Sequence, residues 1–358
     1  MRRGRAVQFT APGVPLEILD VEVPDPGPGE VLVRLEMAGI CGSDVHRLAG
    51  DLPFSGASMC FGHEGIGTVE ALGDEVTFDR AGIPLALGDR VYWFPVALCG
   101  ECEPCRRKQS VSFCERFVWP LPAIRPNAAA FQTLATIGRG VPIYRVPDGT
   151  SSEAIIAFGC AMPTAIGGFL RLGEVTGDVL IQGAGPLGLA AVVLAVRAGA
   201  RVIVIGDPEP RLAMARKLGA TATLSLTGST PAQRKARVLE LTGGHGPATV
   251  IEAAGHVSAF AEGLDLVAAH GRYLIMGLYS GDATIPVNPV TINNRNLTII
   301  GSLGYPEEAL ARTVALAGEL GETYDFASLV THRFPLDRTQ DAIAAVARGD
   351  AIKAVVLP

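Results

Sequence analysis

From about residue 176 onwards the chain alternates short apolar runs with Ala- and Leu-rich stretches, and this alternation limits the folds open to it. Buried strands that alternate with helices form a parallel sheet covered by helices on both faces. We therefore predict an α/β fold with a doubly wound parallel sheet in this part of the chain. The expected strands are Val179–Gln182, Arg201–Ile205, Thr249–Glu252 and Arg272–Gly277, and the expected helices are Leu187–Arg197 and Arg211–Leu218.

A glycine motif, Gly183-Ala-Gly185-Pro-Leu-Gly188, separates the first of these strands from the first helix. The motif alone is weak in a chain with 43 glycines, but the strand before it and the helix after it strengthen the prediction of a dinucleotide site. Its glycines allow a tight turn and close approach to a pyrophosphate at the helix N-terminus. Asp207 follows nineteen residues after Gly188. A carboxylate there accepts hydrogen bonds from the adenosine ribose and repels a 2′-phosphate, so we predict NAD rather than NADP.

The first 150 residues have a different texture, with short strands broken by Pro- and Gly-rich turns such as Pro24–Gly29. The whole chain has 358 residues, which suggests two domains, and its apolar fraction of 48% excludes a disordered protein. The net charge of −6 disfavours binding to a nucleic-acid backbone. The sequence thus predicts a mostly-β domain beside the parallel sheet.

Four of the seven cysteines follow one another closely in the pattern Cys99-x2-Cys102-x2-Cys105-x8-Cys114. Four thiolates at such spacing close a tetrahedral zinc site with no open position, which is a structural site. An iron–sulfur run would have a tighter last gap, usually followed by Pro, where this chain has Glu115. Disulfide pairing is the other alternative. Because no export signal is recognisable, we expect reduced thiols and a cytoplasmic protein.

A second group of metal-binding residues is dispersed along the chain. It comprises Gly39-Ile-Cys41-Gly-Ser43-Asp44-Val-His46, then Gly62-His63-Glu64, and then Gly159-Cys160. Each cysteine or histidine alone is more often a buried core residue, but catalytic zinc takes three such ligands and leaves one position open. We expect the flanking glycines to let the backbone crowd a metal. Cys60 lies beside Phe61 in an apolar run and is interpreted as a packing residue.

These motifs resemble those of the zinc-dependent alcohol dehydrogenases of the medium-chain dehydrogenase/reductase (MDR) superfamily. The resemblance rests on Gly62-His63-Glu64-x2-Gly67-x5-Gly73-x2-Val76 with the upstream Cys41 motif, and it extends along the chain to Ile352-Lys353. It implies a GroES-like catalytic domain over residues 1–160 and 305–358, with a Rossmann domain over 161–304 between its two parts. It also implies a ligand cleft where the domains meet and a homodimer or homotetramer.

The resemblance assigns roles to individual residues. It implies that Cys41, His63 and Cys160 hold a catalytic zinc, with Glu64 able to exchange onto the metal. Ser43 is expected to contact the substrate oxygen, Asp44 to orient His63, and His46 to end a proton relay. A structural zinc would be held by Cys99, Cys102, Cys105 and Cys114. The expected cofactor contacts are Gly183, Gly185, Pro186, Leu187, Gly188, Asp207, Arg211, Met276, Gly277, Leu278 and Lys353.

The function implied is reversible, NAD-linked oxidation of an alcohol with two zinc ions per chain. Three mostly apolar stretches are expected to line the pocket: Leu52–Phe54, Trp93-Phe94 and Phe117–Leu121. They favour a medium-sized secondary or alicyclic alcohol, with a polyol, sugar or amino alcohol as the alternative. A zinc-free reductase would lack the metal ligands. A zinc-stabilised nucleic-acid-binding protein, suggested by Arg106-Arg-Lys108 beside the cysteines, is disfavoured because such charges are usually a solvated turn.

Overall fold

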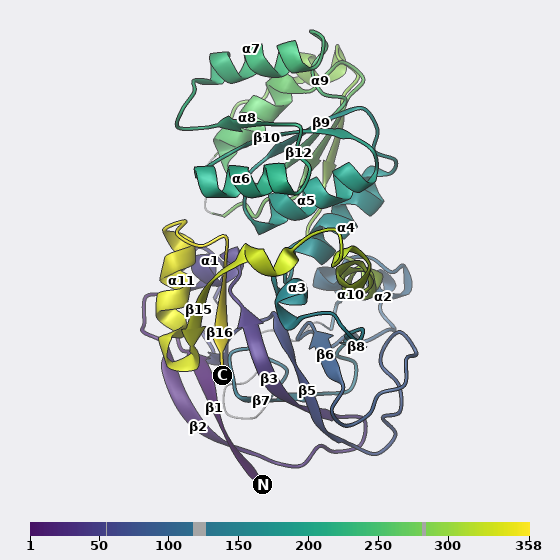
Figure 1. Ribbon diagram of the computed structural model, residues 1–358, viewed down its shortest axis with the longest axis vertical. Coiled ribbons are helices and arrows are strands. Elements are labelled where there is room, and N and C mark those ends of the chain that lie inside the picture. The colour runs from purple at the N-terminus through teal and green to yellow at the C-terminus, as the bar shows by residue number, and fades with distance from the viewer. Residues whose placement is uncertain (55, 117–126, 281–283) are drawn as a thin grey trace. The chain divides into compact units, whose positions relative to one another are not determined.

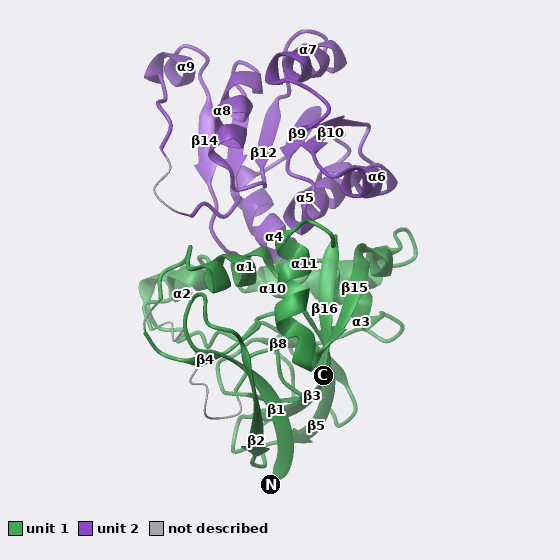
Figure 2. Ribbon diagram, turned by 90° about the vertical axis from the view of Figure 1, so that its left-hand side faces the viewer, with its two compact units in different colours: residues 1–160, 306–358 green, residues 161–305 purple. Residues whose placement is uncertain are grey.

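The computed structural model describes residues 1–54, 56–116, 127–280 and 284–358. They form two compact units, one made of Met1–Cys160 and Pro306–Pro358 and the other of Ala161–Tyr305 (Figure 2). Among the described residues, no helix combines the length and the apolar character needed to cross a membrane.

The first unit is built on antiparallel strands. Within its described residues, one sheet has the order β15-β16-β3-β5-β6-β8, with β7 paired to β3, and a smaller sheet has the order β2-β1-β4. The strands are β1 (Arg2–Phe9), β2 (Glu17–Val23), β3 (Val31–Gly39), β4 (Met59–Cys60), β5 (Gly65–Leu72), β6 (Arg90–Trp93), β7 (Leu134–Ile137), β8 (Ile143–Arg145), β15 (Val330–Pro335) and β16 (Lys353–Leu357).

Short helices connect and cover these strands (Figure 1). The C-terminal segment completes the sheet, because β16 pairs with β3 and with β15. Apolar side chains of β1, β3, β6, β16 and α11 share one core, in which Phe9, Val33 and Trp93 are fully buried. The helices are α1 (Gly42–Ala49), α2 (Glu103–Arg106), α3 (Ser152–Ile156), α10 (Glu308–Leu320) and α11 (Thr339–Ala347).

The second unit carries the predicted parallel sheet. In the part of this unit that the structure describes, six strands run in the order β11-β10-β9-β12-β13-β14, and every neighbouring pair is parallel. The strands are β9 (Asp178–Gln182), β10 (Arg201–Gly206), β11 (Ala222–Ser225), β12 (Thr249–Glu252), β13 (Arg272–Ile275) and β14 (Thr298–Gly301). The helices are α4 (Ala161–Leu172), α5 (Pro186–Arg197), α6 (Glu209–Lys217), α7 (Pro231–Leu241), α8 (Val257–Leu266) and α9 (Pro289–Asn293). The Rossmann fold class is thereby confirmed.

Six described elements of the second unit were not predicted from the sequence: α4, β11, α7, α8, α9 and β14. Strand β11 has no buried residue, since it is the edge strand beside β10, and it lacks the apolar run of a central strand. Helix α7 begins at a capping box, in which Thr230 accepts from the amide of Gln233 while the Gln233 side chain accepts from the Thr230 amide. Helix α8 is capped by His256, whose side chain accepts from the Ser258 amide.

Candidate metal centre and dinucleotide site

The dispersed metal-binding residues come together in the first unit. Ligand atoms of Cys41, His63, Glu64 and Cys160 all lie within 4.8 Å of one another, and the Sγ atoms of Cys41 and Cys160 are 3.2 Å apart. Cys41 lies just after β3 and is the N-cap of α1, and His63 and Glu64 precede β5. Zinc with bonds of ~2.0–2.3 Å in a tetrahedral site separates its ligand atoms by roughly 3.3–3.8 Å. The two thiols and the imidazole therefore fit a zinc ion.

Asp44 supports two of these ligands at once. Its Oδ1 lies 3.2 Å from Nδ1 of His63, and its Oδ2 accepts a hydrogen bond of 2.8 Å from the Cys41 amide. The second contact caps α1. The first fixes the proton on Nδ1 and leaves Nε2 free to bind a metal. One carboxylate thus contacts both the Cys41 amide and the His63 ring, and the orienting role of Asp44 stays a prediction.

The charges of Cys41, His63 and Cys160 suit a divalent cation. A hydrogen bond from Cys160 and the nearby His63 lower the pKa of the Cys41 thiol well below its usual value, although burial opposes this. The Cys160 thiol has its pKa raised by the Cys41 thiolate and by burial. Burial also disfavours a charged His63, but Asp44 and Cys41 outweigh it and raise the pKa of His63. One thiolate is already stabilised, and a metal ion can displace the proton of the second.

Glu64 is held by the chain on both carboxylate oxygens. Oε1 accepts a hydrogen bond of 2.9 Å from the Cys160 amide, and Oε2 pairs with Nζ of Lys353. Both side chains are at most 2% exposed. The Lys353 ammonium, for which the sequence predicts a cofactor contact, has this carboxylate as a partner, and the cofactor contact stays a prediction. The pair keeps the Glu64 charge neutralised beside the metal ligands.

Two of the flanking glycines, Gly39 and Gly159, make room for the Glu64 carboxylate. A Cβ atom added at Gly39 would lie 2.0 Å from Oε2 of Glu64, and one added at Gly159 would lie 2.1 Å from the same carboxyl group. Gly159 also has a positive φ of 46°. Side chains at these two positions would displace the carboxylate, so the glycines are needed to admit it.

Ser43 and His46 lie on helix α1 beside the ligands. Ser43 Oγ is 3.4 Å from Nε2 of His63, which places a hydroxyl at the metal-facing side of the imidazole. His46 Nδ1 is 2.9 Å from Oδ2 of Asp51, and its side chain is one third exposed. The sequence analysis did not single out Asp51, although it follows His46 by five residues and could have been recognised as a nearby carboxylate.

The four clustered cysteines also form one group. Their Sγ atoms lie within 4.8 Å of one another, around the short helix α2. The amides of Cys102 and Glu101 lower the pKa of Cys99 to about 6, while burial and the hydrogen bond with Cys102 raise that of Cys105 to about 12. The donor set is complete for a closed zinc site.

The charged turn beside the four cysteines and the isolated Cys60 have the structural roles that the sequence analysis favoured for them. Arg106 and Arg107 each pair with Glu103 at an exposed turn. Cys60 is buried against Ala6 and Ala129, away from both clusters, as a packing residue would be.

The glycine motif forms a turn that leaves open space at the start of α5. A Cβ at Gly188 would lie 1.8 Å from the Gly183 carbonyl oxygen, so the turn closes only with glycine there, and Gly183 has a φ of 105°. A Cβ at Gly185, the N-cap of α5, would meet no atom within 4 Å. Free amides of a helix N-terminus beside open space fit the pyrophosphate of a dinucleotide.

Models of known families match both units. The alcohol dehydrogenase GroES-like domain matches residues 27–148, and the zinc-binding dehydrogenase domain matches residues 186–319. The chain belongs to the zinc-dependent alcohol dehydrogenases of the MDR superfamily. It is therefore an oxidoreductase with a GroES-like domain, as the motif resemblance implied.

Named relatives of this dehydrogenase act on different alcohols. It is 41% identical to 5-exo-hydroxycamphor dehydrogenase of Pseudomonas putida over 95% of both chains. It is 31% identical to L-threonine 3-dehydrogenase of Deinococcus deserti, over 95% of this chain and 94% of that protein. A zinc-binding dehydrogenase of Sinorhizobium meliloti, solved with NADP bound, superimposes with a TM-score of 0.86 at 27% identity over the full length of both chains.

The residues expected to line the substrate pocket of this dehydrogenase lie in different surroundings. Phe94 lies with its ring centroid 6.0 Å from that of His63 and nearly perpendicular to it, so it is a wall residue of the metal centre. Trp93 was wrongly assigned to the wall. It is fully buried in the core, where its Nε1 donates to the Ala128 carbonyl, because neighbouring residues of an extended chain face opposite ways. Phe54 packs edge-on against Phe9, and Phe117–Leu121 lie outside the described residues.

The remaining predicted cofactor residues of the dehydrogenase lie in the second unit. The amides of Met276 and Gly277 donate to the Glu252 carbonyl. Burial lowers the pKa of Arg211 on α6. Leu278 follows β13, and Pro186 and Leu187 form the first turn of α5. Their contacts with a cofactor stay predictions.

Proposed function

We propose that this dehydrogenase oxidises a medium-sized alicyclic secondary alcohol to the ketone, reversibly, with NAD and one catalytic zinc ion. The observation that carries the proposal is the buried Cys41, His63 and Cys160 set with the apolar ring of Phe94 against the imidazole. An apolar wall favours a ring-shaped hydrocarbon substrate over a polyol. The similarity to a hydroxycamphor dehydrogenase supports the same substrate class.

The chain's own residues would bind the alcohol and move its proton. When bound, zinc acts as a Lewis acid that lowers the pKa of the alcohol, and the nicotinamide ring accepts a hydride. Ser43 is the first proton acceptor, because its hydroxyl adjoins the metal-facing nitrogen of His63. His46, partly exposed and paired with Asp51, stands at the solvent end of the proton path. Asp44 keeps His63 in the tautomer that binds the metal.

We propose NAD as the cofactor because Asp207 follows β10, where a carboxylate repels a 2′-phosphate. Because the similar dehydrogenase of Sinorhizobium meliloti was solved with NADP bound, the choice between NAD and NADP has to be tested. A second, structural zinc in the Cys99–Cys114 cluster, a cytoplasmic location that keeps these thiols reduced, and a homodimer or homotetramer complete the proposal.

A panel of alcohols tests the substrate class. Bicyclic and cyclohexanol-like alcohols should give a kcat/KM at least about tenfold above those of threonine, sorbitol and glucose, each measured with NAD and with NADP, since a mismatched hydroxyl or methylene in an apolar pocket changes binding by ~1–3 kcal/mol. Metal analysis should find two zinc ions per chain. Preferential oxidation of sorbitol or glucose would refute the alicyclic assignment, whatever the cofactor.

The second candidate function is oxidation of an amino alcohol, which the similarity to L-threonine 3-dehydrogenase favours. Threonine carries both a carboxylate and an ammonium group, so its binding requires charged partners in the pocket. Preferential turnover of threonine in the same panel would establish this alternative.

A further inference from the structure

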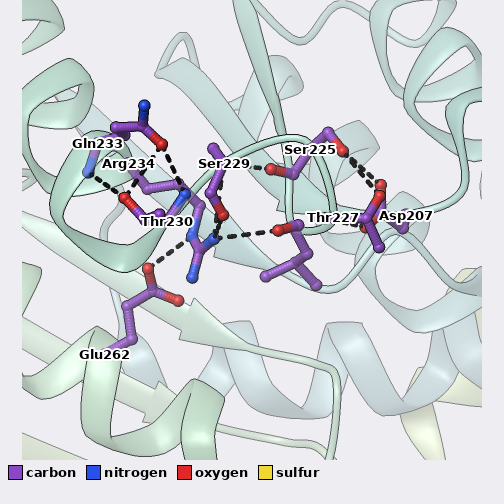
Figure 3. Close-up of polar contacts among 9 residues, drawn as sticks. Asp207, Ser225, Thr227, Ser229, Thr230, Gln233, Arg234 and Glu262 are labelled. Atoms are coloured by element: carbon purple, nitrogen blue, oxygen red, sulfur yellow. Dashed lines mark hydrogen bonds and ion pairs between the residues drawn. The ribbon is translucent and has the colours of Figure 1, made fainter.

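The carboxylate of Asp207 is already held by the protein. Ser225 Oγ donates a hydrogen bond of 2.8 Å to Oδ1, and the Thr227 amide donates one of 2.7 Å to Oδ2 (Figure 3). Both donors belong to the end of β11 and the loop after it, and Ser225 pairs in register with Gly206 of β10. The side chain at the predicted ribose position is therefore held by Ser225 and by the loop of residues 226–229, and does not extend freely into solvent.

This loop is in turn held by a buried arginine. Nη1 of Arg234 donates to the carbonyl oxygen of Ser229 at 2.6 Å and to that of Leu226 at 3.3 Å. The Leu226 side chain is exposed, and Ser229 donates from its hydroxyl to the Ser225 carbonyl. One guanidinium thus binds both ends of the loop and orients the segment that supplies the donors to Asp207.

Arg234 has a buried partner on the neighbouring helix. Its Nε donates to Oε1 of Glu262 on α8 at 2.7 Å, and the two side chains are only 6% and 12% exposed. A buried arginine held by a carboxylate and two carbonyl oxygens cannot rotate without leaving charges unpaired. The loop therefore has a rigid anchor, as Figure 3 shows along the path from Glu262 through Arg234 to Asp207.

We propose that Arg234 is a positioning residue for cofactor selection: it fixes loop 226–229, which holds Asp207 in the orientation that accepts a ribose 2′-hydroxyl and rejects a 2′-phosphate. This inference rests on the proposed NAD linkage. A carboxylate has about four lone-pair sites, so two remain for ribose hydroxyls after the loop has used two. Because the carboxylate cannot rotate away, its negative charge repels a 2′-phosphate, which carries nearly two negative charges.

The test compares two variants of helix α7 that each remove a bridge to α8. Arg234→Met breaks the buried bridge and releases the loop. Lys235→Met breaks an exposed bridge, in which Nζ lies 2.8 Å from both carboxylate oxygens of Asp265, and leaves the loop intact. Arg234→Lys keeps a cation in the same place and should restore part of the effect. Kinetics with NAD and NADP are combined with calorimetric binding of AMP and of adenosine 2′,5′-bisphosphate, which needs no turnover.

Arg234→Met should lower the ratio of kcat/KM for NAD over that for NADP by at least tenfold. The change should lie in KM for NAD, with kcat at saturating NAD within twofold of the parent. The affinity for AMP relative to adenosine 2′,5′-bisphosphate should fall in parallel. Lys235→Met should leave all of these values within twofold. If Arg234→Met does not fold, Ser225→Ala is the second test, because it removes one donor to Asp207. It should lower the ratio of kcat/KM for NAD over that for NADP by about threefold.

The outcomes separate this inference from the proposed function. A parent enzyme that prefers NADP contradicts both the NAD linkage and the role of the loop. A parent that prefers NAD, with ratios unchanged in folded Arg234→Met or in Ser225→Ala, contradicts only the role of Arg234. Equal shifts in Arg234→Met and Lys235→Met would show a general effect of loosening the two helices and would also refute it.

Discussion

The two cysteine clusters of the first unit differ in how far apart their ligands lie in the sequence. The Cys99–Cys114 cluster uses one short segment around a single helical turn. The other cluster joins Cys41 to Cys160, which are separated by 119 residues along the chain. The local cluster can form wherever its segment can curl around an ion. The dispersed cluster exists only when β3, β5 and the segment before α4 are folded against one another.

The clusters also differ in what surrounds their ligands. Around the dispersed cluster, Asp44 orients the histidine, and the buried Glu64–Lys353 pair lies beside the thiols. The local cluster has exposed ion pairs of Arg106 and Arg107 as its neighbours. A site whose ligands are oriented by buried groups is suited to chemistry, whereas a site closed by four thiolates is suited to holding a loop.

Replacing a ligand of the dispersed cluster should have the largest effect on activity. Cys41→Ser removes the thiolate that the cluster stabilises, and loss of Lewis-acid catalysis costs several kcal/mol of barrier, or roughly a thousandfold or more in kcat/KM. The melting temperature should change little. Cys60→Ala, at a buried cysteine outside both clusters, is the matched control and should retain turnover within about twofold. Turnover of Cys41→Ser close to the parent value would contradict the catalytic assignment.

Replacing a ligand of the local cluster should have the opposite effect, acting on the stability of the segment rather than on the catalytic zinc. Cys102→Ser should reduce the zinc content from two ions to one and open the segment, because closed zinc sites contribute folding free energy. Even ~3 kcal/mol of that contribution makes proteolysis within residues 99–114 roughly a hundredfold faster. Limited proteolysis and metal analysis measure this. A variant that keeps both zinc ions would show that these cysteines are not a zinc site.

Removing the group that orients His63 tests what distinguishes the dispersed cluster. Asp44→Asn keeps the size of the side chain but weakens its hold on the Nδ1 proton, and such changes lower metal affinity by about 10–100-fold. Competition with a chelator should show the loss in the catalytic zinc alone, with the structural zinc retained. Equal loss of both ions would mean that Asp44 acts on the stability of the whole unit.

The smallest effect should come from the proton path. His46→Gln should slow alcohol oxidation by about tenfold near neutral pH, at the low end of general-base effects because solvent can take part. Small added bases or high pH should restore much of the rate, and the zinc content should stay unchanged. His245→Gln, at an exposed histidine of the second unit, is the control. Loss of zinc in His46→Gln would contradict a role confined to proton transfer.

The parts of the fold predicted from the sequence were those with a strong local signal. Central strands such as β9 and β12 have apolar centres, Val179–Ile181 and Val250-Ile251, and the glycine turn has a spacing that the geometry of the Gly183–Gly188 contact requires. Among the missed elements, strand β11 lacks an apolar run because it is an edge strand, and helix α7 is announced only by a capping box, which is a short polar pattern. Trp93 was misassigned because composition does not tell which way a side chain faces.

The sequence by itself determined the chemistry available to this protein: which residues can bind metal, where a pyrophosphate can approach a helix, and which family the motifs resemble. Only the tertiary structure decided the partners of the buried charges. Lys353 meets Glu64 across 289 residues, and Arg234 meets Glu262 across 28. Pairing of buried charges depends on distance in space, which local sequence patterns do not contain. The partner of Glu64 and the anchor of the loop that contacts Asp207 therefore became visible only when the chain was folded.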